Sequence, residues 1–245
     1  MNYRFACLLA VCLGVIANQH PSTSASSPDP GADVDILVDG APQPRYAHDG
    51  RWYIEAPKGR EYAIRLHNLY GVRVAVALSV DGLNTIDARQ TTAADARKWV
   101  LDPYETVTIS GWQTSRTEAR RFEFTTEAQS YGQALGRTAN LGIITAVFFR
   151  ERASIVSSQA SNEAERRDAA APAPAPSARQ ESAAGTAKAQ DEYAATGMGR
   201  RTDHAVQQVW LDLEDTPSAT VNIRYEFHTQ LVKLGVLRDT PDPLA

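Results

Sequence analysis

Three acidic residues near the start of the first hydrophobic alternation have the chemistry of a calcium site. Asp33, Asp35 and Asp39 could supply the carboxylate oxygens that Ca²⁺ prefers. They alternate with aliphatic residues, however, and this spacing places them on one face of a strand rather than in a tight loop. The EF-hand pattern with its central glycine is also absent. We therefore interpret these acids as the solvated face of a strand.

The histidines lack the spacing of a metal site. His48, His67, His204 and His228 are far apart in sequence, whereas a zinc site needs three or four converging ligands that are often paired at short spacing. His48 lies beside a predicted turn, and His67 and His228 fall on outward positions of amphipathic strands. We expect surface histidines, no metal site and no cofactor.

No motif of nucleophilic catalysis is present after the first 25 residues. The patterns G-x-S-x-G, S-x-x-K with its companions, and H-E-x-x-H are missing, and no cysteine follows position 12. We assign no catalytic residue. A triad assembled from dispersed residues stays open, because triads are defined by geometry rather than by sequence order.

The segment Thr196–Arg201 combines two glycines with two cations. Its backbone amides and the side chains of Arg200 and Arg201 could hold a phosphate or a carboxylate. The strand before and the helix after a phosphate-binding loop are not predicted here. A turn that re-enters the fold is therefore the favoured interpretation.

Aromatic residues supply the other binding candidates. Trp112 follows a glycine in a predicted loop and is expected to be the most exposed of them, with Tyr104 as a second anchor. Tyr53 points away from Trp52, which shares its parity with core residues. The binding candidates are thus Trp112, Tyr104, Tyr53, Arg200 and Arg201, although packing in the core or a loop is the favoured role for each aromatic.

Composition excludes one class of partner. The 245 residues include 25 Lys and Arg against 29 Asp and Glu, a net charge of −4. A nucleic-acid-binding protein needs a basic surface, so we expect no nucleic-acid partner. The hydrophobic fraction of 43% is sufficient for a globular core.

Residues 1–25 resemble a cleavable signal peptide. A short basic end precedes the apolar stretch Phe5–Ala17, which is too short to span a membrane, and small residues allow cleavage after Ala17 or Ala25. We expect an exported protein, periplasmic or extracellular, without a membrane span. Both cysteines, Cys7 and Cys12, lie in this leader, so no disulfide follows it. A lipoprotein anchored through Cys12 is the alternative.

The remaining chain is predicted to be mainly β, an antiparallel β-sandwich with one or two short helices. A flexible spacer at 26–32 precedes strands with a period of two from 33 to 151. Asp49-Gly50 indicates a type I′ hairpin. We expect a loop or helical turn at 84–98, a short helix at 127–136 and a central strand at 141–149, whose apolar residues face both sides.

A disordered Ala- and Pro-rich linker is predicted at 152–192, because this stretch has almost no aliphatic or aromatic residue. After it, residues 193–240 are expected to contain strands at 209–213 and 221–227 and a short helix at 229–234. Two strands alone are marginally stable. They should therefore complete the same domain.

Four short strings resemble a family of uncharacterised exported bacterial proteins. They are Ser79–Asn84 (SVDGLN), Gly111-Trp112, Asn140–Ile144 (NLGII) and Ala195–Gly199 (ATGMG). The resemblance extends over about 33–150 and 193–237. It implies one unit in two parts and brings no activity, cofactor or catalytic residue.

These observations favour an exported, non-enzymatic binding or envelope interaction module, with a protein or a glycan as partner. The alternative is a secreted or periplasmic hydrolase that acts on an envelope or environmental polymer. The oligomeric state is left open.

Overall fold

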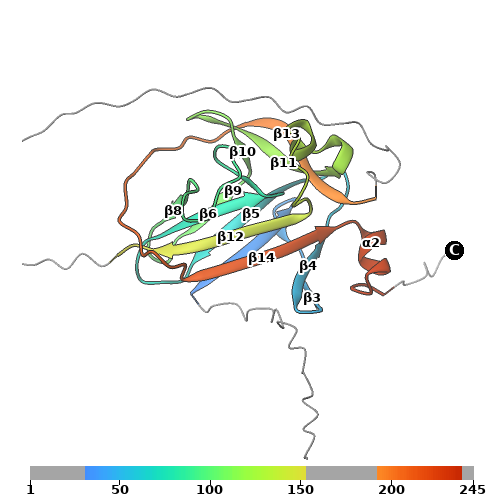
Figure 1. Ribbon diagram of the computed structural model, residues 1–245, viewed down its shortest axis with the longest axis horizontal. Coiled ribbons are helices and arrows are strands. Elements are labelled where there is room, and N and C mark those ends of the chain that lie inside the picture. The colour runs from blue at the N-terminus through green and yellow to red at the C-terminus, as the bar shows by residue number, and fades with distance from the viewer. Residues whose placement is uncertain (1–30, 153–191, 239–245) are drawn as a thin grey trace, which may run out of the picture.

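Two β-sheets pack face to face in the computed structural model, which describes residues 31–152 and 192–238 (Figure 1). The predicted fold class, a mainly β sandwich with short helices, is confirmed. The expected signal peptide, both cysteines, and nearly all of the expected spacer and linker lie outside the described residues.

Sheet A contains seven strands, and β13, from beyond the undescribed segment, is one of them. Its core runs in the order β10, β11, β5, β1, β2, with β13 paired to β11 and β9 paired to β5. The strands are β1 (Ala32–Val38), β2 (Ala41–Pro42), β5 (Glu61–Asn68), β9 (Thr106–Ile109), β10 (Gly111–Gln113), β11 (Glu118–Thr126) and β13 (Ala194–Asp203).

Sheet B is also seven-stranded, in the order β3, β4, β14, β12, β6, β7, with β8 paired to β6. All its pairs are antiparallel except β4 with β14. The strands are β3 (Tyr46–His48), β4 (Arg51–Glu55), β6 (Val74–Val80), β7 (Leu83–Asn84), β8 (Trp99–Leu101), β12 (Ile143–Arg150) and β14 (Ala219–Glu226). β12 lies between β14 and β6, which confirms the predicted central strand.

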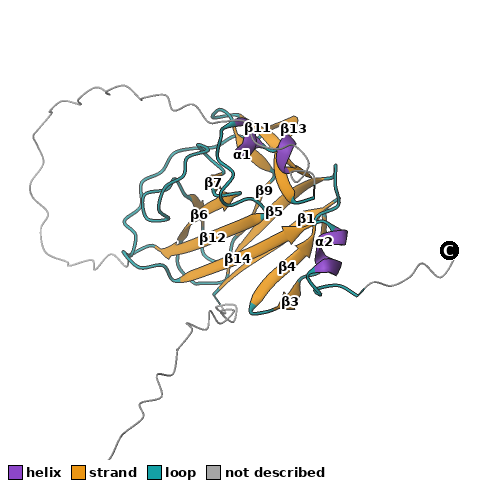
Figure 2. Ribbon diagram, turned by 45° about the vertical axis from the view of Figure 1, so that its right-hand side comes forward, coloured by secondary structure: helices purple, strands orange, loops and turns teal. Residues whose placement is uncertain are grey.

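One hydrophobic core fills the space between the sheets. Alternate residues of each strand point inward, as the period of two requires, and the strands after the undescribed segment contribute Ala194, Ile223 and Tyr225 to it. Tyr62 stacks on Phe124 with ring centroids 4.1 Å apart. Figure 2 shows the two layers with loops at both ends.

Two aspartate-glycine turns close hairpins at opposite ends of sheet B. Asp49 and Gly50 have φ of 45° and 71° and join β3 to β4, which confirms the predicted hairpin. Asp81 and Gly82, with φ of 52° and 73°, join β6 to β7 in the same way. Aspartate and glycine tolerate this left-handed region, which other residues adopt at a cost.

The helices are short and lie where the sequence predicts them. A 3-10 turn, η1 (Glu127–Gln129), leads into α1 (Tyr131–Ala134), and Ser130 caps α1 by accepting a hydrogen bond from Gln133 N. α2 (His228–Lys233) is followed by Gly235 at φ 75°. Residues 85–98 form turns and loop, also as predicted.

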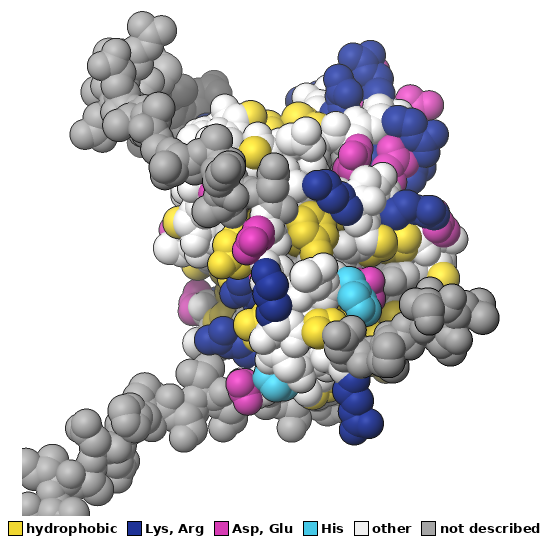
Figure 3. All heavy atoms as spheres, turned by 90° about the vertical axis from the view of Figure 1, so that its right-hand side faces the viewer, with side chains coloured by type: hydrophobic (Ala, Val, Ile, Leu, Met, Phe, Trp, Pro, Cys, Tyr) yellow, Lys and Arg dark blue, Asp and Glu magenta, His cyan; other side chains and the backbone are white. Residues whose placement is uncertain are grey.

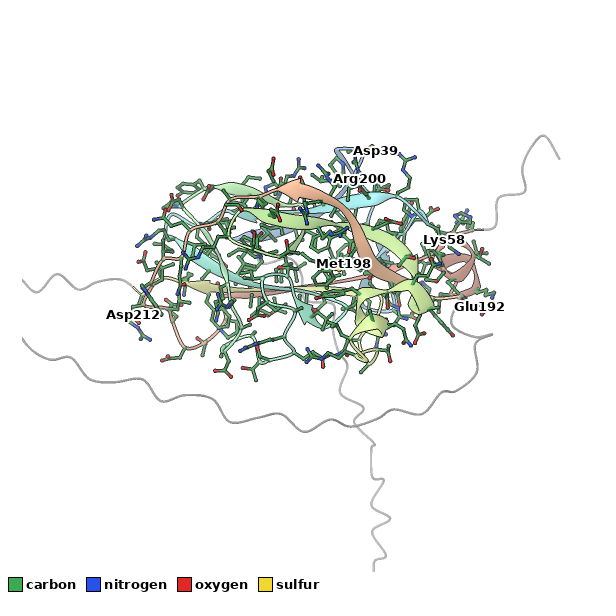
Figure 4. All side chains as sticks on the ribbon, turned by 90° about the horizontal axis from the view of Figure 1, so that it is seen from above. Asp39, Lys58, Glu192, Met198, Arg200 and Asp212 are labelled. Carbon is green, nitrogen blue, oxygen red and sulfur yellow. The ribbon has the colours of Figure 1, made fainter. Side chains whose placement is uncertain are left out.

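The predicted strand at 209–213 is wrong. Residues 204–213, here called the crossover segment, run from sheet A to sheet B along the edge of the sandwich, in orange at the left of Figure 1. Figure 4 shows its last part, at Asp212, at the opposite end of the molecule from Glu192. Only Leu213 forms a β-bridge, with Glu151. The segment forms backbone hydrogen bonds near its two ends, from His204 and Val206 to the β10–β11 turn and between Asp212 and Arg152, but it pairs with no strand over a continuous run, so its alternating pattern does not make it a strand.

The turn expected at Thr196–Arg201 is also wrong, because these residues form the centre of β13. The pairing with β11 has a bulge within them, between the pairs Arg120–Arg201 and Phe122–Met198. A β-carbon on Gly199 would lie 3.1 Å from the Arg121 carbonyl oxygen, so glycine here permits a close approach of backbone rather than a turn.

Within residues 31–152 and 192–238, no helix has the length and apolar character needed to cross a membrane.

Candidate functional site

A hollow of about 920 Å³ lies over β14 and its neighbours in sheet B, and its lining extends to Arg45 and to Asp33 of β1 in sheet A. Figure 1 views the molecule from this side, with β12 and β14 in front. Loop residues at its edges include Thr91, Asn140 and Pro217. The hollow thus combines a sheet surface with walls from three separate connections.

The floor of the hollow is rich in hydroxyl and amide groups. Ser79, Thr145 and Asn222 are aligned across β6, β12 and β14, because Thr145 pairs with both of the others. Each occupies an outward position between core residues. Thr145 Oγ1 donates a hydrogen bond to Asn222 Oδ1 at 2.8 Å. These side chains can donate to and accept from the hydroxyl groups of a ligand.

Beneath one end of the hollow lies a buried polar junction centred on Asp81. Its carboxylate accepts hydrogen bonds from the Gly142 N–H at 2.8 Å, the Thr196 N–H at 2.7 Å and the Tyr225 hydroxyl. The Thr196 hydroxyl lies 2.6 Å from both the Tyr225 and the Tyr62 hydroxyls. Because Thr196 belongs to sheet A and Tyr225 to sheet B, this junction links the two sheets. Asp81 is fully buried, so the junction is not open to a ligand.

The four strings that resemble an exported family meet at or beside this junction. Asp81, Gly142 and Thr196 belong to three of them, and Trp112 of the fourth donates its indole N–H to Gly197 O at 3.1 Å. Their common role in this chain is structural, because each string supplies a buried contact between segments far apart in sequence. Membership of that family stays an expectation.

The junction predicts a pH dependence of stability. Burial raises the pKa of Asp81 from 3.8 to about 6, against the hydrogen bonds from Tyr225, Thr196 and Gly142 that act in the opposite direction. The stabilisation of the neutral acid is therefore complete below pH 3.8 and is lost as the pH rises through about 6. The gap between these pKa values corresponds to about 3 kcal/mol.

We expect the free energy of unfolding of the natural chain, relative to that of Asp81→Asn, to fall by about this amount between pH 4 and pH 7. Urea denaturation of both chains at several pH values measures the difference. Every other titrating group is common to both chains, so its contribution cancels in the subtraction. A constant difference across this range would contradict the burial of a titrating Asp81.

The outer face of sheet A carries an ion-pair cluster around Asp35. Arg65 Nη2 lies 2.7 Å from Asp35 Oδ2, and Arg45 bridges Asp33 at 2.9 Å and Asp35 at 3.1 Å. Partial burial raises the pKa of Asp35, but hydrogen bonds from Arg65, His67 and Arg45 outweigh it and bring this pKa to about 2. The acids at 33 and 35 are therefore neutralised by arginines, and no group of three or more metal-ligating side chains occurs in the described ranges.

The side chains of Asp35, His67 and Thr106 are arranged like the acid, the histidine and the hydroxyl of a catalytic triad. His67 Nε2 lies 3.0 Å from Asp35 Oδ2 and its Nδ1 lies 3.0 Å from Thr106 Oγ1. A nucleophile also needs free N–H donors for the developing oxyanion. β5, which carries His67, is paired on one side with β1 and on the other with β9, so its N–H groups are used within the sheet. His67 and Thr106 also lie outside the hollow.

Trp112 has the packing role favoured for the aromatic residues, and the alternative of an exposed anchor in a loop is wrong. Only 2% of this residue is accessible, because it lies in β10 rather than in a loop and its ring packs edge-on against Phe122 and Tyr131. Tyr53 does point away from Trp52, but it too is buried, at 5% exposure. Neither side chain can serve as an exposed anchor in this structure.

The other binding candidates are exposed but lie apart from one another. Tyr104 is 73% exposed in the turn before β9. Arg200 pairs with Glu61 at 2.6 Å, and Arg201 pairs with Glu118 at 3.4 Å. The Thr196 N–H is used by Asp81. The five candidates therefore form no common surface, and Figure 4 shows Arg200 on β13, which belongs to sheet A rather than to the hollow.

Sequence reasoning missed two exposed features. Trp210, on the crossover segment, is 89% exposed, and strand parity gives no signal for it, because the segment is not a strand and the neighbouring Val209 is exposed as well. The hollow itself has a weak signal, namely polar residues at the outward positions of β6, β12 and β14. The end of the sandwich seen in Figure 3 shows hydrophobic side chains as separate areas among charged and polar ones.

No protein-family model, curated protein or solved structure matches this chain.

Proposed function

We propose that this protein is an exported, non-enzymatic binding module whose ligand is a glycan bound in the hollow on sheet B. The hollow carries the proposal, because it joins a volume of about 920 Å³ to a floor of aligned hydroxyl and amide side chains. Ligand sites are typically concave and hold a few convergent polar groups. The signal-peptide pattern of residues 1–25 supports export.

The lining favours a glycan over a protein partner. Protein interfaces are centred on exposed aromatic and aliphatic side chains. None of the large hydrophobic residues that are exposed lines the hollow: Leu69, Val72, Tyr104, Leu135, Tyr193, Met198, Val209, Trp210 and Leu234 all lie elsewhere. The hydroxyl-rich floor matches the hydroxyl groups of sugars instead.

A substitution that fills the hollow tests this function. We expect Asn222→Trp to reduce binding to a polysaccharide array at least tenfold while the fold is kept, because position 222 is exposed on a strand that tolerates aromatic residues. Thr108→Trp is the matched control, since it places the same side chain at an exposed strand position on sheet A. Equal glycan binding by both variants and the natural chain, or no binding by any of them, would contradict the proposal.

A hydrolase is the second candidate, and the Asp35–His67–Thr106 arrangement is the observation in its favour. It is the weaker candidate because the paired strand beneath His67 offers no free N–H donors for an oxyanion and the arrangement lies outside the hollow.

A further inference from the structure

Arginines outnumber acids along the hollow. Arg45, Arg51 and Arg224 line it against a single acid, Asp33, although the whole chain carries a net charge of −4. Arg45 is already neutralised by Asp33 and Asp35. The unpaired positive charge in the hollow therefore comes from Arg51, whereas Arg224 is paired with Glu226 and offers a ligand the N–H donors that this pair leaves unused.

Arg224 is held in place by a buried acid. Its Nε and Nη2 both donate to Glu226 Oε1, at 2.9 and 2.6 Å, and the Glu226 side chain is only 2% exposed. Two of the five N–H donors of a guanidinium are used in this way. In the described part of the chain, Nη1 of Arg224 makes no hydrogen bond and Glu226 Oε2 has no partner either. The guanidinium is thus oriented from one side and open on the other.

Arg51 lies on the neighbouring strand and faces the same side. β4 runs parallel to β14 with Tyr53 beside Arg224, and Arg51 has the parity of Tyr53. Arg51 lies two residues along β4 from Tyr53, the neighbour of Arg224 on the adjacent strand. This offset places the backbones of Arg51 and Arg224 about 8 Å apart. Arg51 is exposed and makes no ion pair with any described residue. Two acidic groups along one chain can therefore be bound at once.

We infer that the ligand is an acidic polysaccharide whose carboxylates are bound by Arg224 and Arg51, while its hydroxyl groups contact the Ser79–Thr145–Asn222 floor. This inference rests on the proposed function and adds the charge of the ligand. Arginine is suited to it because its planar fork matches a carboxylate. A lipid or a nucleic acid would need fully exposed apolar or aromatic side chains in the hollow, whereas Trp52, Ile143 and Val221 in its lining are only partly exposed and the exposed large hydrophobic residues lie elsewhere.

The test compares polysaccharides that differ only in charge. Polygalacturonate, alginate and hyaluronan are each immobilised beside their carboxyl-reduced, neutral forms, and binding of the full exported chain is measured at several salt concentrations. We expect at least one acidic form to bind about tenfold more tightly than its neutral form, with a preference that weakens as salt is added.

Two variants identify the residues. The first is the double variant Arg224→Gln/Glu226→Gln, which leaves the net charge unchanged and leaves no buried carboxylate unpaired. The second is Arg51→Gln, which changes an exposed residue. We expect each to lose most of the acidic preference while binding to the neutral form stays within about twofold. Thermal unfolding of the double variant confirms that it folds, and Arg51→Gln tests the inference if it does not.

The outcomes separate the two proposals. Equal binding of acidic and neutral forms by the natural chain would overturn the acidic ligand and leave the glycan-binding function standing. An acidic preference that survives both variants would overturn the roles of Arg224 and Arg51. Absence of binding to every polysaccharide, charged or neutral, would overturn the proposed function itself.

Discussion

A chain that ends at Glu151 is expected not to fold cooperatively. β14 is an interior strand of sheet B, between β12 and β4, and the hairpin of β3 and β4 has no other attachment to this sheet. The truncation also removes β13 from β11 and takes Ile223 and Tyr225 out of the core. The broken sheet would expose apolar side chains and unpaired backbone groups.

Circular dichroism during heating tests this with residues 31–151. We expect no sharp thermal transition and a tendency to aggregate. Adding a second fragment, residues 192–245, should restore a cooperative transition, because the missing strands pair with β4, β11 and β12 through the sheet rather than through chain continuity. A cooperative transition of the first fragment alone would show that the two parts are independent.

Removal of the Asp81 carboxylate is expected to cost about 3–5 kcal/mol of stability. Asp81→Ala leaves the Gly142 and Thr196 N–H groups and the Tyr225 hydroxyl without their acceptor in the buried junction. Each buried donor left unpaired costs about 1–3 kcal/mol. The loss is greater than that of an ordinary surface ion pair, which contributes at most about 1 kcal/mol.

Asp49→Ala is the matched control for this variant. Asp49 also occupies the first position of an aspartate-glycine turn with positive φ, but its side chain is 87% exposed. The control therefore carries the backbone strain of alanine in the left-handed region, about 1 kcal/mol, without the buried hydrogen bonds. Urea denaturation at pH 4 gives both values, because at pH 7 the ionised Asp81 has already lost about 3 kcal/mol of its stabilisation. If the two variants lose equal stability, the junction does not hold the sheets together.

The position of Trp112 also changes how binding can be tested. A Trp112→Ala variant would open a cavity beside Phe122 and Tyr131 and disturb packing, so a loss of binding would not identify a contact with the ligand. Asn222 and Arg51 are exposed in the hollow and separate binding from folding more cleanly.

The candidate site was only partly readable from the sequence. The outward parity of Ser79 follows from the alternation of its strand, whereas the strand of Thr145 is apolar on both faces and gives no such signal. Nothing local places either residue beside Asn222, which is 77 residues from Thr145. The ion pair of Arg224 with Glu226 was also only partly predictable. Two residues apart on one strand, the two side chains must share a face, and this much follows from the sequence. The burial of Glu226 depends on packing that only the folded chain provides.

By itself the sequence determined the class of fold, the hairpin at Asp49-Gly50, the central strand β12 and the short helices. These features depend on side-chain alternation, turn residues and capping, which act over a few neighbouring residues. The tertiary structure decided that Trp112 is buried, that β13 is a strand, and that the crossover segment is not one. It also placed Asp81 in a sealed junction and Arg224 in an open hollow. Those outcomes depend on which strand lies beside which, and pairing across long stretches of chain is fixed by the packing of the whole sandwich rather than by local sequence.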